Sequence, residues 1–273
     1  MNIDLMAIGI PILINGAILV VAALLQLLTI SGGISAFILG VIIYYFTGFK
    51  GWVLLIFFFV SANFIGKVGR YVRAVDTSKI HKKGSKRDWV QVFANGGIAG
   101  VAALLYGLTG NLVALTMFGA SLAASTADTW ASEAGILSSA PPVSIITFKP
   151  VPPGMSGGIS LLGSVSSIAG SLLIGSSWYN AYAVDGSLRY VILASIITLS
   201  GVVGSFADSY LGATIQGHYW DPVNNLITER TSRDGQEFEL CRGIRWIDND
   251  MVNLISNIIA VLFATTIAII VLP

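Results

Sequence analysis

Two short motifs place an acidic residue at the end of a long apolar run: Ala127-Asp128-Thr129-Trp130 and Ala207-Asp208-Ser209-Tyr210. A carboxylate at the centre of a membrane helix costs about 2.5–3.5 kcal/mol, so it needs a compensating role. Because the two acids stand in matching contexts, the sequence predicts one polar site that two helices share. Carboxylate and hydroxyl oxygens are preferred Mg²⁺ ligands, and we expect the chemistry here.

The first motif continues as a polar run. If the helix extends past Asp128, Ser132 lies on the same face and Glu133 lies one turn beyond Thr129. Mg²⁺ is usually held by one or two carboxylates together with phosphate and water. The run from Asp128 to Glu133 therefore predicts part of a metal–phosphate site.

A proline- and glycine-rich segment, Lys149 to Gly158, predicts a place for phosphate. Its prolines hold the chain extended before Ser156, Gly157 and Gly158 open a helix. The N–H groups and the dipole at a helix N-terminus favour an anion, and Lys149 adds a positive charge. A plain helix entry explains the same residues.

The start of the last apolar segment is also polar. Asp248 is typical of an N-cap. Asn249, Asn253 and Asn257 follow at intervals of four and form a stripe that runs into the bilayer. Buried amides need partners, and we expect the carboxylates or a bound metal–phosphate to supply them.

Composition indicates a membrane protein. The 273 residues are 55% hydrophobic and only 11% charged, with a mean hydropathy of +0.80, whereas soluble domains carry about 25% charged residues. We expect one polytopic, all-α membrane domain over residues 1–273, whose first segment is a retained helix and no signal peptide. Cys241, the single cysteine, excludes an intrachain disulfide, and the net charge of +1 indicates no attraction to nucleic acid.

Apolar segments long enough to span a bilayer number about eight. The two short ones, Ile34–Phe49 and Trp52–Gly66, are either full spans or a re-entrant or tilted pair. The candidates are Ile3–Thr29, Ile34–Phe49, Trp52–Gly66, Trp89–Leu108, Leu112–Trp130, Gly158–Ser176, Tyr190–Ile215 and Met251–Leu272.

Charge fixes the expected orientation. Of the 15 Lys and Arg residues, only Lys50 and Arg189 fall opposite to the basic loop 67–88 and the mixed loop 216–249. The positive-inside rule places both loops in the cytoplasm and both termini outside. Attraction to anionic lipid explains the basic loop equally well.

Two smaller features complete the expected architecture. We expect Asn95-Gly96-Gly97-Ile98-Ala99 and Ser156-Gly157-Gly158-Ile159-Ser160 each to open a helix whose hairpin partner ends in an Asp-bearing motif, which indicates a parallel helix-hairpin repeat or a chance match. Alternation around Asp234-Gly235 predicts a small cytoplasmic β-hairpin.

These blocks, in this order, resemble the domain of unknown function ninety-two family of integral membrane proteins. That family includes the plant phytyl-phosphate kinase of tocopherol synthesis and the animal transmembrane protein nineteen. One departure is Asp250, where the family pattern has Asn. The matching stretches are KRDWVQVFANGG, ADTWASEAG, KPVPPGMSGGISLLGS, GSFADSYLGATIQ and DNDMVNLISN.

The resemblance implies Mg²⁺-dependent transfer of the γ-phosphoryl group of CTP or another nucleoside triphosphate to a phytyl- or geranylgeranyl-type monophosphate. We expect catalytic roles for Asp128, Glu133, Asp208 and Lys149, and metal binding by Asp128, Glu133, Asp208 and Asp248. The expected phosphate-binding residues are Lys67, Arg70, Lys82, Lys86, Arg87, Asn95, Ser156, Gly157, Gly158 and Asn253.

Two other functions fit the same residues. Intramembrane acids and glycine-rich helices also suit a cation- or proton-coupled carrier, although its polar residues should reach both sides of the membrane. A nucleotidyltransferase that acts on a lipid phosphate would use the same metal chemistry at the α-phosphate. Neither is excluded by the sequence.

Overall fold

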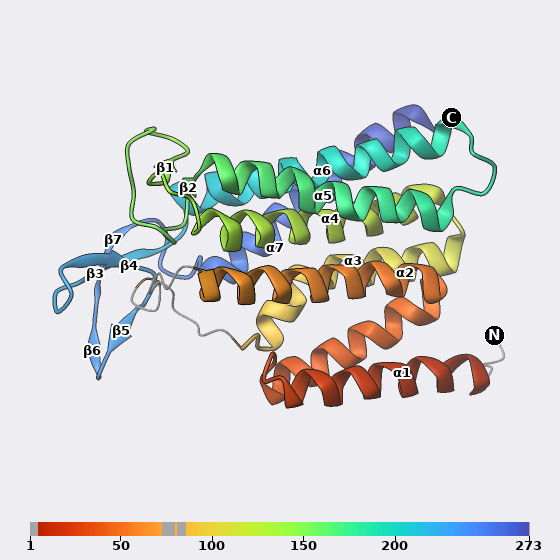
Figure 1. Cartoon of the computed structure of the whole chain (residues 1–273), viewed down its shortest axis with the longest axis horizontal. Helices are drawn as coiled ribbons and strands as arrows, with labels where there is room; N and C mark the ends of the chain where they lie inside the picture. Colours follow the sequence, from red (N-terminus) through yellow and green to blue (C-terminus); the bar gives the residue numbers. More distant parts are fainter. Residues whose placement is uncertain (1–4, 73–79, 81–85, 273) are drawn as a thin grey trace.

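Helices dominate the computed structural model, which describes residues 5–72, 80 and 86–272 (Figure 1). Six are long and apolar enough to cross a membrane, and α1 contributes a shorter apolar stretch, Ile8–Leu24. The expected class, an all-α integral membrane protein, is confirmed. The helices of this part of the chain are α1 (Leu5–Leu24), α2 (Ile30–Val72), α3 (Trp89–Thr109), α4 (Leu112–Gly135), α5 (Leu161–Tyr182), α6 (Leu188–Thr214) and α7 (Asn249–Val271).

The expected count of about eight helices is slightly too high because of α2. The segments Ile34–Phe49 and Trp52–Gly66 belong to this one helix, which is broken at Gly48. Gly48 has a φ of 70° and a ψ of −171°, a conformation that glycine adopts without steric cost. The chain turns back there with no loop, so the two halves of α2 run in different directions (Figure 1).

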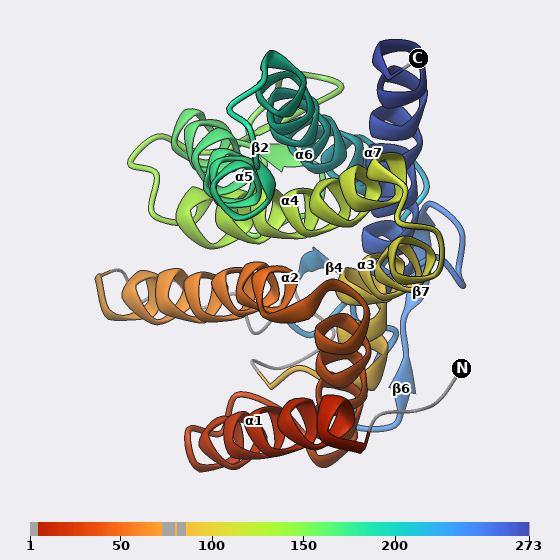
Figure 2. The same cartoon turned by 90° about the vertical axis from the view of Figure 1, so that its right-hand side faces the viewer.

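Helix α4 lies in the middle of the bundle, with α5 and α6 on one side and α3 and α7 on the other (Figure 2). Of the most apolar stretch of 18 residues in α4, 72% are buried. Small residues allow this close packing: a Cβ on Gly204 of α6 would lie 2.8 Å from the Ala124 Cβ of α4. The two helices that carry the acidic motifs are therefore direct neighbours.

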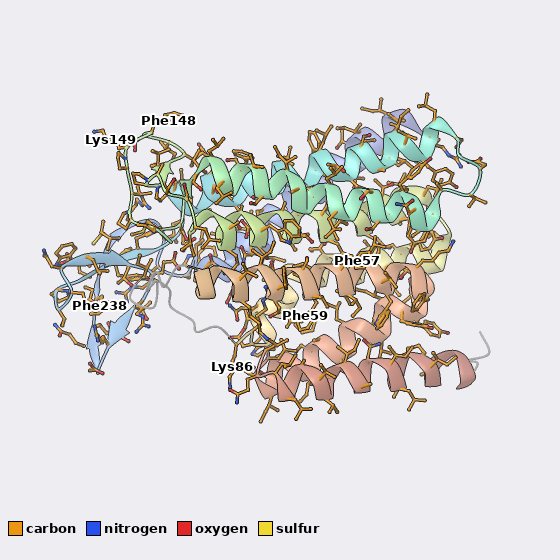
Figure 3. All side chains as sticks on the ribbon, in the orientation of Figure 1. Phe57, Phe59, Lys86, Phe148, Lys149 and Phe238 are labelled. Atoms are coloured by element: carbon orange, nitrogen blue, oxygen red, sulfur yellow. The ribbon has the colours of Figure 1, made fainter. Side chains whose placement is uncertain are left out.

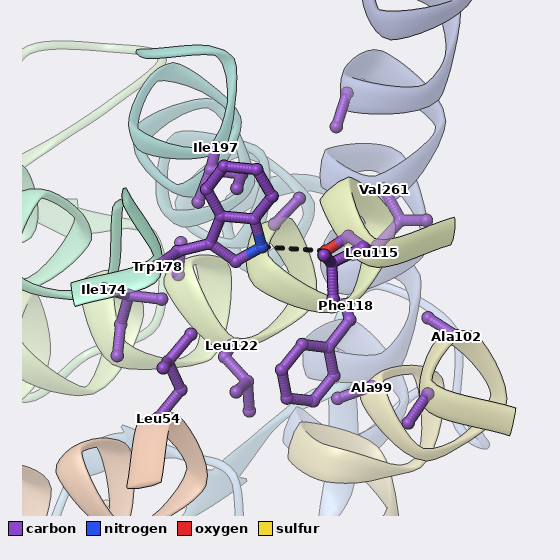
Figure 4. Packing of buried hydrophobic residues seen from close by; sticks show 14 of the residues in the cluster. Leu54, Ala99, Ala102, Leu115, Phe118, Leu122, Ile174, Trp178, Ile197 and Val261 are labelled. Atoms are coloured by element: carbon purple, nitrogen blue, oxygen red, sulfur yellow. Dashed lines mark hydrogen bonds between the residues drawn. The ribbon is translucent and has the colours of Figure 1, made fainter. Parts of the chain in front are cut away.

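Large side chains fill the part of the bundle near the beginning of α4. Trp178, Phe118 and Leu122 are fully buried there, and the Trp178 Nε1 donates to the Leu115 carbonyl at 3.1 Å (Figure 4). Ala99 and Ala102 of α3 pack against the same cluster. This half of the molecule is a tightly packed apolar core.

Small antiparallel sheets gather at the other end, beyond the last turns of α4 and α6 (Figure 1). The expected hairpin around Asp234-Gly235 is confirmed as the pair β5–β6. Helix α1 begins and α7 ends at the end away from the sheets (Figure 1). The strands are β1 (Val143–Ser144), β2 (Gly158–Ile159), β3 (His218–Asp221), β4 (Leu226–Thr228), β5 (Ser232–Arg233), β6 (Gln236–Glu237) and β7 (Glu239–Arg242), with the order β4-β3-β7 in the largest sheet.

The expected repeat does not begin as predicted. Asn95 lies inside α3, because Asp88 and Gln91 form a capping box that starts this helix at Trp89. Gly157 has a φ of 84° and Gly158 pairs with β1, so α5 begins only after the cap at Ser160. The prediction that both glycine motifs open helices is wrong, although α4 and α6 do run in the same direction (Figure 1).

Candidate functional site

A polar cavity of about 590 Å³ lies where the helix ends meet the sheet-bearing loops. Helices α3 to α7 all contribute side chains to it, and so do the loops that follow α4 and α6. Several residues expected from the sequence line this cavity: Arg87, Asn95, Asp128, Glu133, Ser156, Gly157, Gly158, Asp208, Asp248 and Asn253.

The carboxylates of Asp128 and Asp208 form the centre of the site. They come from α4 and α6, both are half-buried, and they lie close enough for their charges to interact. The Ser256 hydroxyl of α7 donates to the Asp208 Oδ2 at 3.1 Å. Three helices thus place two acids in one cavity, as the matching motifs predicted.

A chain of hydrogen bonds ties α3, α4 and α7 together behind this pair. The Asn257 Nδ2 donates to the Ser125 Oγ at 2.8 Å, and the Ser125 Oγ donates to the Asn95 carbonyl at 2.6 Å. The Asn257 Nδ2 thus pairs with a hydroxyl and with the Ser121 carbonyl, whereas we expected the carboxylates or a bound metal–phosphate as partners. The chain is a structural link that fixes the spacing of the helices.

Arg87 and Glu133 form a second charged region of the cavity. The Arg87 guanidinium lies 5.7 Å from the Phe58 ring centroid and interacts electrostatically with Glu133. Burial lowers the pKa of Arg87, and the Glu133 carboxylate opposes this effect. Glu133 packs against α2, where a Cβ on Gly66 would lie 3.1 Å from its carboxylate.

The turn at Ser156–Gly158 is held between α6 and the loop that follows it. A Cβ on Gly157 would lie 2.5 Å from the Ala213 Cβ, so only glycine fits this position. The Ser156 hydroxyl donates to the Glu229 carboxylate. The turn borders the cavity rigidly, although not as the helix N-terminus that we predicted.

Sequence reasoning missed two buried acids in the cavity. Glu229 is 6% exposed and Asp250 is 4% exposed. Glu229 stands in a loop of mixed charge that resembles a solvated surface, and only the tertiary fold shows its burial. Asp250 carried a signal, because the resemblance led us to expect Asn at this position. Asp248 caps α7 by accepting a hydrogen bond from the Met251 N–H at 3.2 Å, as expected.

Several expected phosphate ligands lie elsewhere. Lys67, Lys86 and Lys149 are exposed and do not line the cavity. Figure 3 shows Lys149 at the tip of the loop between β1 and β2, pointing away from the bundle. The Arg70 side chain and Lys82 lie outside the described residues. Among the residues that are described, Arg87 and Arg245 supply the positive charge of the lining.

The carboxylates fit a cation that takes most of its ligands from outside the protein. Within the described ranges, no three His, Cys, Asp or Glu side chains lie close enough together to form a metal cage. Mg²⁺ typically takes only one or two carboxylates and completes its shell with phosphate oxygens and water. The pair Asp128 and Asp208 matches that requirement.

A narrow apolar groove of about 70 Å³ adjoins the polar cavity. It lies between α1, α2 and α3 and is lined by residues such as Leu19, Phe37 and Phe59; Figure 3 labels Phe59. The groove and the cavity share three lining residues, namely Arg87, Gln91 and Asn95. An apolar tail in the groove would therefore present its head group to Arg87.

Comparison with known proteins gives a family and several relatives. The family described as "Integral membrane protein DUF92" matches residues 13–261. Protein PGR of Arabidopsis thaliana is 33% identical over 262 residues, which cover 88% of each chain. An uncharacterized membrane protein of Methanocaldococcus jannaschii is 34% identical over 221 residues, covering 79% of this chain and 88% of that protein. No solved structure matches.

Proposed function

This chain belongs to the DUF92 family of integral membrane proteins, which confirms the resemblance, and we propose that it is a membrane-embedded isoprenyl-phosphate kinase. The enzyme transfers the γ-phosphoryl group of a nucleoside triphosphate to a phytyl- or geranylgeranyl-type monophosphate and yields the diphosphate.

One observation carries this proposal: a polar cavity with a carboxylate pair meets an apolar groove at a half-buried arginine, Arg87. A lipid phosphate has the same division, with a hydrocarbon tail and a dianionic head. The groove suits the tail, and Arg87 suits the phosphate because a guanidinium forms paired hydrogen bonds to phosphate oxygens. Asp128 and Asp208 then face the part of the cavity that the nucleotide occupies in this proposal.

The chemistry requires positioning more than acid–base catalysis. An oxygen of the prenyl monophosphate attacks the γ-phosphorus, and the bond from this phosphorus to the β–γ bridging oxygen breaks. The nucleoside diphosphate leaves with that oxygen. Because the attacking oxygen is already anionic, no strong base is needed. Arg87 orients the acceptor, and the rigid turn at Gly157 borders the path of the phosphates.

Asp128 and Asp208 would hold the Mg²⁺ ion, and Glu133 and Asp248 border the same space. Mg²⁺ would supply charge neutralisation for the phosphate oxygens. Ser256 keeps the Asp208 carboxylate turned toward the cavity through its hydrogen bond. The lysines expected to bind phosphate are replaced in this role by Arg87 and Arg245.

The proposal also includes the orientation of the protein in the membrane. The cavity and most of the described basic residues lie at the sheet-bearing end of the bundle, and we place this end in the cytoplasm, where nucleotides are available. Lys50 and Arg189 lie at the other end, near Tyr182 and Tyr190 respectively. Both termini then face outward. The packed core around Trp178 argues against a solute path through the bundle.

The test is a product analysis with the purified protein in lipid nanodiscs. Mg²⁺, each of the four nucleoside triphosphates, and phytyl or geranylgeranyl monophosphate are supplied, and products are identified by mass spectrometry. We expect a nucleoside diphosphate and a prenyl diphosphate in equal amounts. Release of pyrophosphate would indicate nucleotidyl transfer. No turnover, together with solute flux in liposomes, would replace the kinase by a carrier.

A further inference from the structure

The amide of Gln216 is buried at the cavity without a protein partner. Gln216 follows the end of α6, is 1% exposed and lines the cavity. Within the described part of the chain, neither its Oε1 nor its Nε2 has a hydrogen-bond partner. Leaving a buried polar group unpaired costs about 1–3 kcal/mol. Two such atoms on one side chain indicate a ligand that pairs with both.

The backbone of Gln216 is fixed by its surroundings. Its N–H donates to the Leu211 carbonyl at 3.2 Å, and its carbonyl lies 2.9 Å from the His218 Nδ1. Because a carbonyl oxygen only accepts, the His218 Nδ1 donates in this contact, and an Arg242 guanidinium nitrogen lies 3.3 Å from the His218 Nε2. Burial lowers the pKa of His218, and the hydrogen bond to the Gln216 carbonyl opposes this effect. The amide is therefore presented from a rigid loop.

Gln216 lies just beyond the end of α6, whereas Asp208 lies within the last two turns of this helix, and both residues line the cavity. Eight residues separate it from Asp208, which corresponds to about 12 Å along a helix at 1.5 Å per residue. Between them lies the Gly157 turn: a Cβ on Gly212 would lie 3.1 Å from the Gly157 nitrogen and 3.5 Å from the Gln216 Oε1. Because the acids, the turn and Gln216 all line one cavity, an elongated ligand that fills this cavity can reach from the acids to Gln216.

The two open atoms restrict the chemistry of this ligand. An amide offers one acceptor and one donor in the same plane. A phosphate at neutral pH offers mainly acceptors, and a prenyl tail offers no donor and no acceptor. Neither ligand group can therefore pair with both the Oε1 and the Nε2 of Gln216. The edge of a nucleobase carries a donor beside an acceptor, and glutamine pairs with such an edge through two hydrogen bonds.

We propose that Gln216 is the residue that recognises the base of the nucleoside triphosphate. This inference rests on the proposed kinase function and adds the position of the base to it. The triphosphate runs from Gln216 past the Gly157 turn to Asp128 and Asp208. Tyr219 and Arg245 line the same end of the cavity, where the Tyr219 hydroxyl donates to the Arg245 carbonyl at 3.0 Å.

The experiment measures equilibrium binding to the full-length protein in nanodiscs with Mg²⁺. The probes are the four nucleoside triphosphates, the 2′-deoxy form of the tightest one, and inorganic tripolyphosphate. The variant Gln216→Met keeps the side-chain volume and removes both polar atoms, and Gln216→Glu keeps an acceptor but removes the donor. Gln236→Ala, at an exposed glutamine of β6, is the matched control.

We expect the wild-type protein to prefer one base. In Gln216→Met this preference should fall roughly ten- to hundredfold, the range for one bidentate base contact, while tripolyphosphate binds as before. The melting temperature without nucleotide should stay the same or rise, because the removed atoms have no protein partner. Gln216→Glu should lose selectivity as well, and Gln236→Ala should match the wild type.

Several results would overturn the inference. These are an unchanged preference in Gln216→Met, equal binding of all four bases by the wild type, or no nucleotide binding at all. Loss of tripolyphosphate binding would assign Gln216 to the phosphates, and equal weakening of all four nucleotides and of the deoxy form would assign it to the sugar. Selective binding without transfer to a prenyl monophosphate would refute the kinase but keep the base contact.

Discussion

Asp128 and Asp208 owe their position to small side chains around them. Gly204 and Ala124 let α6 approach α4 closely, and Ser256 holds the Asp208 carboxylate from α7. A carboxylate pair in a half-buried place is unfavourable without a cation. The pair therefore contributes to cation binding and not to the stability of the fold. Removing its charges should leave the fold intact.

The first prediction concerns this pair. Asp128→Asn and Asp208→Asn should each lower kcat for phosphoryl transfer by at least about 10²-fold, the size of effect seen when one preorganised electrostatic group is lost. The melting temperature should stay the same or rise, since asparagine is of equal size and removes a repulsive charge. Asp185→Asn, at an exposed loop position at the other end of the bundle, is the control. Full activity in both cavity variants would contradict the site.

The second prediction separates Arg87 from its neighbour Lys86. Arg87→Lys keeps the charge but loses the planar fork and the contact with Phe58. The KM for the prenyl monophosphate should rise roughly tenfold or more, since a hydrogen bond to a charged group contributes about 1.5–3 kcal/mol. The KM for the nucleotide should stay unchanged. Lys86→Ala should change neither KM, because this side chain is exposed and does not line the cavity.

At the scale of the secondary-structure elements, the positions where helices begin and end decide where the site residues lie. The sequence predicted most helices within a few residues, because long apolar runs and caps such as Asp88 and Asp248 are local signals. It also placed the acidic pair and the hairpin at Asp234-Gly235. The break in α2 and the extended turn at Gly157 were not predictable, because each depends on a glycine whose φ is positive only in the folded chain.

Long-range packing also decided the remaining errors. Whether a lysine faces the cavity depends on how its loop folds over the helix ends, and Lys149 is carried outward by the β1–β2 loop. Glu229 and Gln216 are buried by contacts between segments far apart in the sequence. Spacing along one chain contains no such information.

The third prediction tests the turn before α5. Gly157→Ala adds a Cβ 2.5 Å from the Ala213 Cβ at a position with a φ of 84°. The free energy of unfolding should fall by more than about 2 kcal/mol, and transfer activity should fall with it. Gly186→Ala is the matched control: its φ of 63° is also positive, but nothing lies within 4 Å of the added Cβ. It should cost about 1–2 kcal/mol and leave activity unchanged. Equal losses in both variants would show that the Ala213 contact is unimportant.

The whole molecule is divided into a packed half and a polar half. The core around Trp178 and Phe118 fills one end of the bundle, and the cavity and the sheets occupy the other. Such a division suits a reaction at one face of the membrane. Because the two ends differ, the orientation of the protein in the bilayer can be tested by labelling each end.

The fourth prediction uses Cys241, the single cysteine, which is exposed on β7. A membrane-impermeant maleimide should label it in inside-out vesicles and leave it unlabelled in intact cells. Val184→Cys in a Cys241→Ser background places the thiol in an exposed loop at the other end and should give the opposite pattern. Labelling of Cys241 from outside would invert the proposed orientation.

In the proposed kinase, the apolar groove beside Arg87 would determine how the lipid substrate is supplied. A lipid that enters between α1, α2 and α3 is delivered by diffusion in two dimensions, so its effective concentration is a mole fraction of the bilayer. Adding inert phospholipid at constant total amounts of enzyme and prenyl monophosphate should therefore slow the reaction, as in surface-dilution kinetics. The turnover rate would then follow the composition of the membrane around the protein more closely than the volume of the surrounding solution.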